Sequence, residues 1–184
     1  RLTAGTVRLD DASLAADQGP GGPRTAGQFT KLNIEAQRTQ FWPGGLNLQT
    51  TLQGQIASKN LASAEKMSLG GPSGVRGYPV GEAVGDSGAI LGLELRYALG
   101  ATLAGAPVSL AAFYDVGTVT FNQQGNPLGP NQVTLDSAGV GLLAGRAGDY
   151  LLNASLAWRI GSPLPSGGEP DRSPRLWLTT QKWF

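Results

Sequence analysis

The stretch AILGLELRYAL, residues 89–99, alternates between apolar and polar side chains. Its apolar positions are Leu91, Leu93, Leu95, Tyr97 and Leu99. The other face carries Glu94 and Arg96. A period of two residues is typical of a β-strand with one apolar face. The same period runs through residues 46–56 and 150–160, so the sequence predicts three strands that each have one polar face.

Weaker forms of this alternation give five further candidate strands, at residues 1–12, 27–41, 107–119, 133–144 and 175–184. No segment is a convincing helix, so we expect an all-β, antiparallel fold with eight strands. The connections alternate between short and long. The short ones are residues 42–45, 100–106 and 145–149, and the long ones are residues 13–26, 58–86, 118–132 and 161–174. All the long connections fall on one side of an up-and-down meander. This asymmetry is typical of an outer-membrane β-barrel, whereas soluble sandwiches mix both kinds at both ends.

The composition narrows the possible functions. Among its 184 residues the chain has neither Cys nor His, which excludes disulfides, thiol nucleophiles, Ser-His triads and the usual zinc sites. We therefore expect no metal, no cofactor and no enzymatic activity. The net charge of +1 gives no reason to expect nucleic acid as a partner. No apolar run approaches the roughly 18 residues of a spanning helix, but a barrel strand needs only about 9–11 residues.

Several aromatic residues lie near the ends of the predicted strands, namely Trp42, Tyr97, Tyr150, Trp158 and Trp183. Trp and Tyr are favoured at membrane interfaces because the ring can sit in the apolar boundary while its polar edge stays wet. Aromatic residues are also common in the strands of any β protein, so this alternative remains open.

The connection at residues 58–86 is far longer than an ordinary hairpin loop and is rich in glycine. Loops of this size are generally functional or disordered. Its centre contains the tetrad Val75, Arg76, Gly77 and Tyr78. A second pattern, F-x-D-x-G, is formed by Phe113, Asp115 and Gly117 on the next predicted strand but one. Together these motifs resemble those of the outer-membrane transporters of two-partner secretion, of the haemolysin-activator type, within the BamA-like superfamily.

This resemblance implies a sixteen-stranded transmembrane barrel whose sixth outer loop folds back inside and carries the tetrad at its tip. Counted back from the terminal Phe184, the loop at 58–86 falls between strands eleven and twelve. Residues 1–184 are then the C-terminal half of the barrel, and we expect upstream sequence, because a free half-barrel would expose two strand edges in lipid. Phe184 resembles the signal by which the barrel-assembly machinery recognises its substrates, although Lys182 stands where an apolar residue is usual.

The alternation also supports a contact between the two motifs, if the loop folds inward as the resemblance implies. The apolar set at residues 108–116 turns Phe113 and Asp115 towards the lumen, where Arg76 could meet Asp115. An Arg fork on a carboxylate makes two parallel charge-assisted hydrogen bonds, which Lys could not reproduce. Such a bond contributes about 1.5–3 kcal/mol, enough to bias the loop towards a docked state but not to lock it. The alternative is a solvated Arg76 and an Asp115 that merely favours a turn.

Glu94, Arg96 and Arg159 also face the predicted lumen. Keeping a channel wet explains them better than a specific substrate contact. Glu65 and Lys66 fit either a folded stem of the loop or a free surface pair.

The function that follows is a pore of the bacterial outer membrane that translocates an unfolded partner exoprotein to the cell surface, with the loop inside it at rest. Its expected partners are the exoprotein, the barrel-assembly machinery and the lipid bilayer. One alternative is an assembly and insertion factor of the same superfamily, which the number of upstream soluble domains would distinguish. Another is a small eight-stranded barrel acting as an anchor or enzyme, but side chains would already fill so narrow a lumen.

Overall fold

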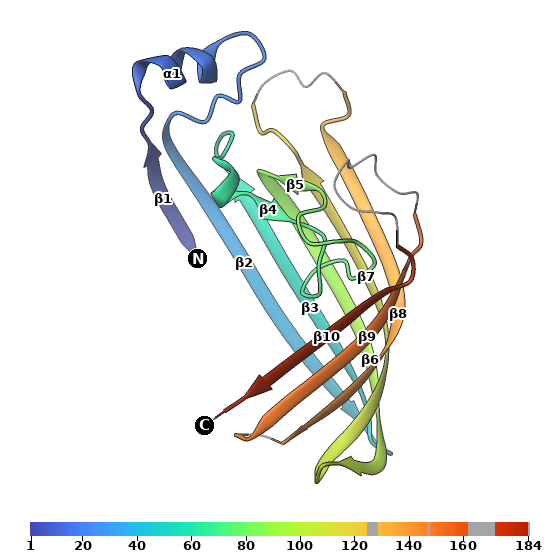
Figure 1. The fold of residues 1–184 in the computed structure, drawn as a ribbon. Coiled ribbons are helices and arrows are strands. Elements are labelled where there is room, and N and C mark those ends of the chain that lie inside the picture. The colour runs from blue at the N-terminus through green and yellow to red at the C-terminus, as the bar shows by residue number, and fades with distance from the viewer. Residues whose placement is uncertain (125–128, 147, 162–171, 184) are drawn as a thin grey trace.

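The computed structural model describes residues 1–124, 129–146, 148–161 and 172–183. Eight strands form one antiparallel sheet in chain order: β1 (Leu2–Val7), β2 (Gly27–Trp42), β3 (Leu46–Ala57), β6 (Ser87–Leu103), β7 (Ala106–Thr120), β8 (Gln132–Arg146), β9 (Tyr150–Arg159) and β10 (Arg175–Lys182). The sheet curls into a trough with β1 and β10 at its edges (Figure 1). The predicted all-β, antiparallel architecture is confirmed.

Two details of the prediction were wrong. The first strand ends at Val7, and the segment that follows forms helix α1 (Asp11–Gln18). Asp10 caps this helix, because its Oδ1 accepts a hydrogen bond from the Ser13 amide at 2.9 Å. Within the described ranges, no helix has the length and hydropathy needed to cross a membrane.

The second error concerns the connection predicted at residues 100–106. There β6 runs on to Leu103 after a shift of register between Ala98 and Thr102. The turn itself is only Ala104-Gly105, with φ values of 46° and 78°. Two successive residues with positive φ are typical of the tight turns that match the twist of a hairpin.

The convex face of the sheet is covered by apolar side chains that no other part of the described chain buries. Exposures between 36% and 69% are found for Leu32, Ile34, Leu52, Leu93, Leu95, Leu110, Tyr114, Val140, Trp158, Leu176 and Leu178. A water-soluble sheet would cover such a face, whereas strands in a bilayer turn it towards lipid.

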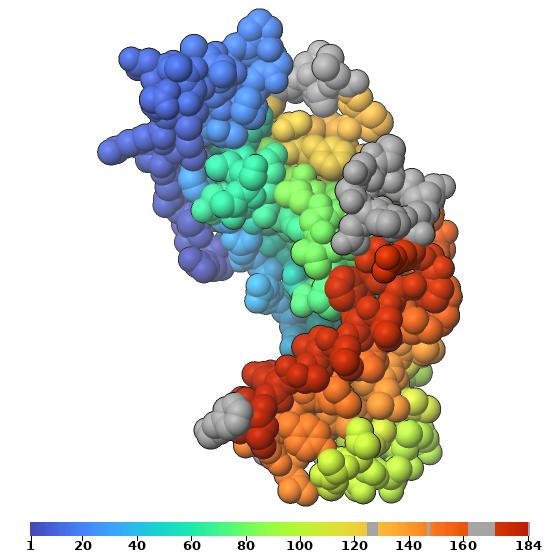
Figure 2. Space-filling model, viewed as in Figure 1, coloured from blue at the N-terminus to red at the C-terminus, as the bar shows by residue number. Residues whose placement is uncertain are grey.

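Residues 58–86 fold against the concave face. They contain the short helix η1 (Ser63–Glu65) and the small hairpin of β4 (Met67–Ser68) and β5 (Val84–Gly85). In Figure 2 the green residues of this loop occupy the hollow between the blue edge and the red edge of the sheet. A buried apolar cluster joins the loop to β6, β7 and β8 through Leu69, Val75, Tyr78, Ala83, Ile90, Val119 and Leu135. The core of this half-open sheet therefore lies inside the trough, under the loop.

Candidate functional site: the loop tip on the concave wall

Strand register places the inward-facing polar residues in rows. Asp115 of β7 pairs with Gly92 on β6 and with Ser137 on β8, and Ser137 pairs with Arg159 on β9. Two residues further along these strands, again facing inward, Glu94 of β6 pairs with Phe113 of β7. The two carboxylates thus lie on adjacent strands, one row apart, on the wall that the loop tip reaches.

Arg76 and Asp115 meet as the fork that the sequence predicted. Nε of Arg76 donates to Oδ2 of Asp115 at 2.9 Å, and Nη2 donates to Oδ1 at 2.8 Å. The Arg76 amide donates to Oδ2 at 3.2 Å, and the Ser137 hydroxyl donates to the same oxygen at 3.3 Å. The Asp115 side chain is 2% exposed, so the structure contradicts the alternative of a solvated pair.

Glu94 is a second partner of Arg76, which the sequence reasoning missed. Nη1 of Arg76 donates to Oε2 of Glu94 at 2.5 Å, and Nε of Arg96 donates to Oε1 at 2.7 Å. Burial alone would lower the pKa of Arg76, but its bonds to Asp115 and Glu94 raise it overall, so the guanidinium stays charged. Two cations and two anions share this cluster, which balances its charge. Glu94 and Arg96 therefore do more than keep the wall wet.

The remaining residues of the two motifs shape the space around the fork. The Phe113 ring stacks on the Arg76 guanidinium, whose Cζ lies 3.3 Å from the ring centroid. A Cβ at Gly117 would lie 3.1 Å from Leu69 and 3.1 Å from Val75, so glycine leaves room for the loop. A Cβ at Gly77 would lie 2.7 Å from the Ser137 Cβ. The two glycines therefore allow the tip to lie flat on the wall.

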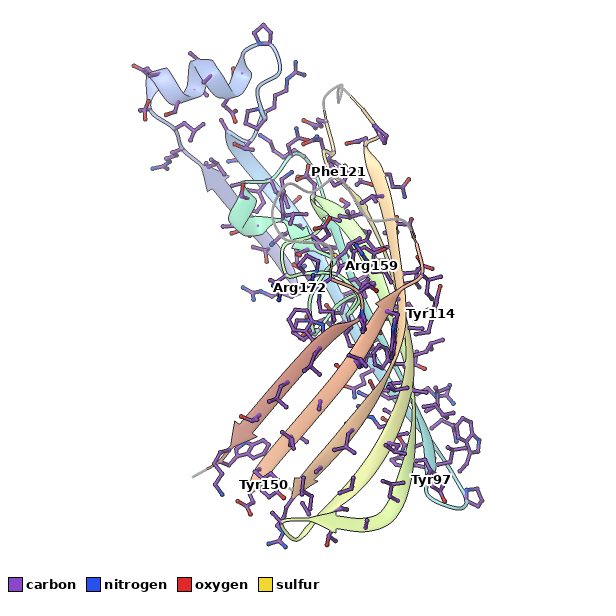
Figure 3. The ribbon with its side chains drawn as sticks, turned by 45° about the vertical axis from the view of Figure 1, so that its right-hand side comes forward. Tyr97, Tyr114, Phe121, Tyr150, Arg159 and Arg172 are labelled. Atoms are coloured by element: carbon purple, nitrogen blue, oxygen red, sulfur yellow. The ribbon has the colours of Figure 1, made fainter. Side chains whose placement is uncertain are left out.

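Tyr78 and Val75 insert into the apolar cluster and are 1% and 0% exposed. The Arg159 guanidinium lies over the Tyr78 ring, 5.6 Å from its centroid. Figure 3 shows Arg159 on the inner side of the sheet, and Tyr114 on the outer side. The side chains of the tetrad therefore contact strands β6, β7 and β9.

Trp177 is another contact that the sequence reasoning missed. Its indole Nε1 donates to the backbone carbonyl of Arg76 at 2.7 Å. The alternation of β10 places Trp177 on the inner face, since Leu176 and Leu178 are exposed on the outer one. That pattern could have indicated an inward tryptophan, but not its partner.

The base of the loop is a folded stem, so Glu65 and Lys66 are not a free pair. Glu65 binds Lys31 of β2 at 2.9 Å, and Lys66 binds the buried Asp86 at 2.8 Å. Asp86 also accepts from the Gln123 amide at 2.8 Å, beyond the end of β7. The stem is therefore fixed to β2 on one side and to the residues after β7 on the other.

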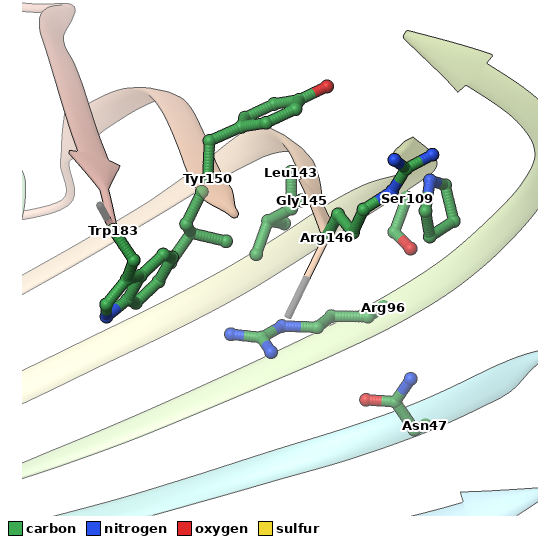
Figure 4. Close-up of a pocket in the computed structure, with 10 residues that line it drawn as sticks. Asn47, Arg96, Ser109, Leu143, Gly145, Arg146, Tyr150 and Trp183 are labelled. Atoms are coloured by element: carbon green, nitrogen blue, oxygen red, sulfur yellow. The ribbon is translucent and has the colours of Figure 1, made fainter. Parts of the chain in front are cut away.

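A hollow of about 320 Å³ opens at the short-turn end of the trough. Figure 4 shows Arg96, Arg146, Tyr150 and Trp183 among the residues that line it. Trp183 is 41% exposed, and Trp42, Tyr97 and Trp158 are 40–51% exposed, so all four rings are accessible near strand ends. Phe184, the predicted assembly signal, lies outside the described residues. The described part of the chain holds no group of three His, Cys, Asp or Glu residues that could bind a metal.

Comparisons with known proteins agree with this architecture. Residues 4–144 match the family of the haemolysin secretion/activation protein ShlB/FhaC/HecB. The heme/hemopexin transporter protein HuxB of Haemophilus influenzae is 33% identical over 159 residues, which cover 85% of this chain and 27% of HuxB. CdiB from Escherichia coli has a similar fold, with a TM-score of 0.66 at 23% identity over 90% of this chain and 29% of CdiB. The chain spans little more than a quarter of these relatives. It belongs to the ShlB/FhaC/HecB family of outer-membrane β-barrel transporters of two-partner secretion.

Proposed function

We propose that this chain is the C-terminal half of a sixteen-stranded pore that passes an unfolded partner exoprotein to the cell surface. Membership of a secretion family supports transport rather than insertion of other barrels. The sheet has two edges, β1 and β10, among the described residues, and unpaired edges are costly in lipid. Further strands that close the barrel would turn the concave face into its lumen. The lipid bilayer and the barrel-assembly machinery are the partners proposed for its insertion.

We further propose that residues 58–86 occupy this lumen at rest and are latched there by Arg76. The observation that carries the proposal is the contact of one loop arginine with two carboxylates of the wall, Asp115 and Glu94. Breaking a buried pair by removing one partner costs about 3–5 kcal/mol, because it leaves an uncompensated charge. A wet lumen lowers this cost, because a released Arg76 is solvated there. The latch therefore favours one docked position while leaving release possible.

Secretion by the full-length protein tests this proposal. In Asp115→Asn and in Arg76→Ala, we expect less exported partner, because a loop that is no longer held would fill the pore in many positions instead of one. The amount of folded, heat-modifiable barrel should stay near that of the parent, since most of the sheet is untouched. Asp11→Asn is a matched control, because Asp11 is an exposed carboxylate on helix α1 and is not part of the latch. Parental secretion in both latch variants would refute the latch.

The position of the loop can be measured separately. Residues 1–184 contain no cysteine, so Val75→Cys introduces the one thiol of this segment, at a side chain that is 0% exposed while the tip is docked. A water-soluble maleimide should label it slowly in the parent background. Labelling should be about ten- to a hundredfold faster with Asp115→Asn, as expected from a loss of about 1.5–3 kcal/mol.

A further inference from the structure

Arg76 is held from two directions. Its guanidinium bonds to β6 and β7, whereas its carbonyl accepts the hydrogen bond from Trp177 on β10. The chain separation of Arg76 and Trp177 is 101 residues. A single loop residue thus joins the middle of the sheet to its last strand.

The geometry of the next residue makes this possible. Gly77 follows the carbonyl of Arg76 and lies against the wall, where a Cβ would come 3.1 Å from the Arg159 backbone nitrogen and 2.7 Å from the Ser137 Cβ. Without a side chain at Gly77, the Arg76–Gly77 peptide can approach β8 and β9 closely and present its oxygen to the indole. The contact therefore depends on the docked position of the tip.

The strand that receives this contact is the last strand of the described sheet. Among the described strands, β10 pairs with β9 alone, from Arg175 opposite Ala157 to Lys182 opposite Tyr150. Its outward residues Leu176 and Leu178 are 69% and 67% exposed. At its far end, Lys182 bonds to Asp149 of the neighbouring turn. Near its start, the indole of Trp177 ties the inner face of β10 to the loop.

We propose that Trp177 is a positioning residue that couples the loop tip to β10, the last strand of the sheet. Docking of Arg76 orders the first half of β10, and release of the tip loosens it. Because such coupling is reciprocal, loosening β10 also favours release of the tip. The proposal rests on the loop latch proposed above and adds that the last strand of the sheet responds to it.

Amide hydrogen exchange of β10, measured on the full-length protein in lipid nanodiscs, tests the coupling. Asp115→Asn should speed exchange at residues 175–179, although the substitution lies on β7. Trp177→Phe should do the same and should raise labelling of Val75→Cys roughly two- to tenfold, the effect of one lost hydrogen bond. The double variant should exchange in β10 no faster than either single variant. This non-additivity is the signature of a shared contact and would not arise from two separate structural defects.

Trp158→Phe is the matched control, because Trp158 lies on the adjacent strand β9 and is 40% exposed on the outer face. It should change neither measurement. Faster Val75→Cys labelling in Asp115→Asn with unchanged β10 exchange would overturn the coupling and leave the latch intact. Unchanged labelling in Asp115→Asn would overturn both. The Asp115→Asn arm keeps Trp177, so the result stands even if Trp177→Phe fails to fold.

Discussion

At the scale of single residues, each member of the two motifs has a distinct physical task. Arg76 supplies a planar group that can bind Asp115 bidentately and still reach Glu94 with its remaining nitrogen. Lysine offers one compact ammonium and could not span both carboxylates in this geometry. Phe113 closes one side of the guanidinium, and Gly117 provides room for the loop behind it. The charged contact and the close fit therefore support each other.

The fit at Gly117 gives a prediction about space rather than charge. In Gly117→Ala the new methyl group would lie 3.1 Å from both Leu69 and Val75 of the loop, closer than ordinary carbon contacts. We expect the tip to dock less well by about 1–3 kcal/mol, the usual cost of overpacking. Labelling of Val75→Cys should still become faster by at least about fivefold, because the close contact with Leu69 remains when Val75 is replaced.

The control for that experiment is Gly54→Ala on β3. There the nearest atom to an added Cβ is the Gly88 carbonyl oxygen at 3.8 Å, an ordinary contact. Both variants add the same methyl group to a strand, so they differ mainly in contact with the loop. Equal labelling rates in the two would contradict the assigned role of Gly117.

At the scale of elements, the strands were predictable and the contacts of the loop were only partly so. All eight strands appear because a bilayer outside and water inside force apolar and polar residues to alternate. The alternation turned Asp115 inward, and the resemblance of the loop motif to that of the secretion transporters brought Arg76 to it. Predicting the contact of Arg76 with Glu94 required the strand register, which sets Glu94 beside Phe113. Predicting its contact with Trp177 required the path of the loop tip. Neither pairing leaves a periodic trace in the sequence.

Helix α1 was missed because it has only eight residues and no wide apolar stripe. A buried carboxylate near its end stabilises the turn that follows it. Asp17 accepts from the Thr25 amide at 2.8 Å, the Thr25 hydroxyl at 2.7 Å and the Ala26 amide at 3.0 Å. Hydrogen bonds of this kind carry no sequence period, so strand-based reasoning placed this segment in a loop.

The same contacts make the α1 segment sensitive to acid. Burial raises the pKa of Asp17, but the Thr25 and Ala26 amides lower it below 3.8 overall. The ionised form therefore stabilises the turn at pH values above the unfolded pKa, and this contribution is lost as the pH falls through the lower, folded pKa. Exchange protection of residues 17–26, corrected for intrinsic rates, should be constant at neutral and mildly acidic pH and should fall once the pH drops below the ordinary pKa of aspartate and through the lowered pKa of Asp17. Asp17→Asn should lack protection even at neutral pH, whereas Asp11→Asn, at an exposed position, should behave like the parent.

At the scale of the whole molecule, the arrangement of apolar residues is the reverse of that in a soluble β-protein. The buried cluster lies on the concave side, between the loop and strands β6 to β8. The convex side presents an exposed apolar band that only a nonpolar solvent would stabilise. Figure 3 shows Tyr97 and Tyr150 at the end of the sheet with the short turns, opposite Phe121. The loop and the bilayer thus bury the two faces of one sheet by separate means.

This division predicts opposite responses to the same charge on the two faces. Leu93 lies near the middle of β6, is 36% exposed on the convex side, and pairs with Thr50 and Tyr114. Leu93→Lys should destabilise the barrel by about 2–4 kcal/mol, the cost of a lysine at the bilayer midplane.

Gln37 of β2 lies on the concave side, because it pairs with Thr51, which itself pairs with Gly92 in the row of Asp115. Gln37→Lys should change the stability by less than about 0.5 kcal/mol, since its ammonium would stay in water. Urea unfolding in lipid vesicles, followed by loss of heat modifiability, measures both, and similar midpoints for the two variants would show that lipid does not cover the convex face.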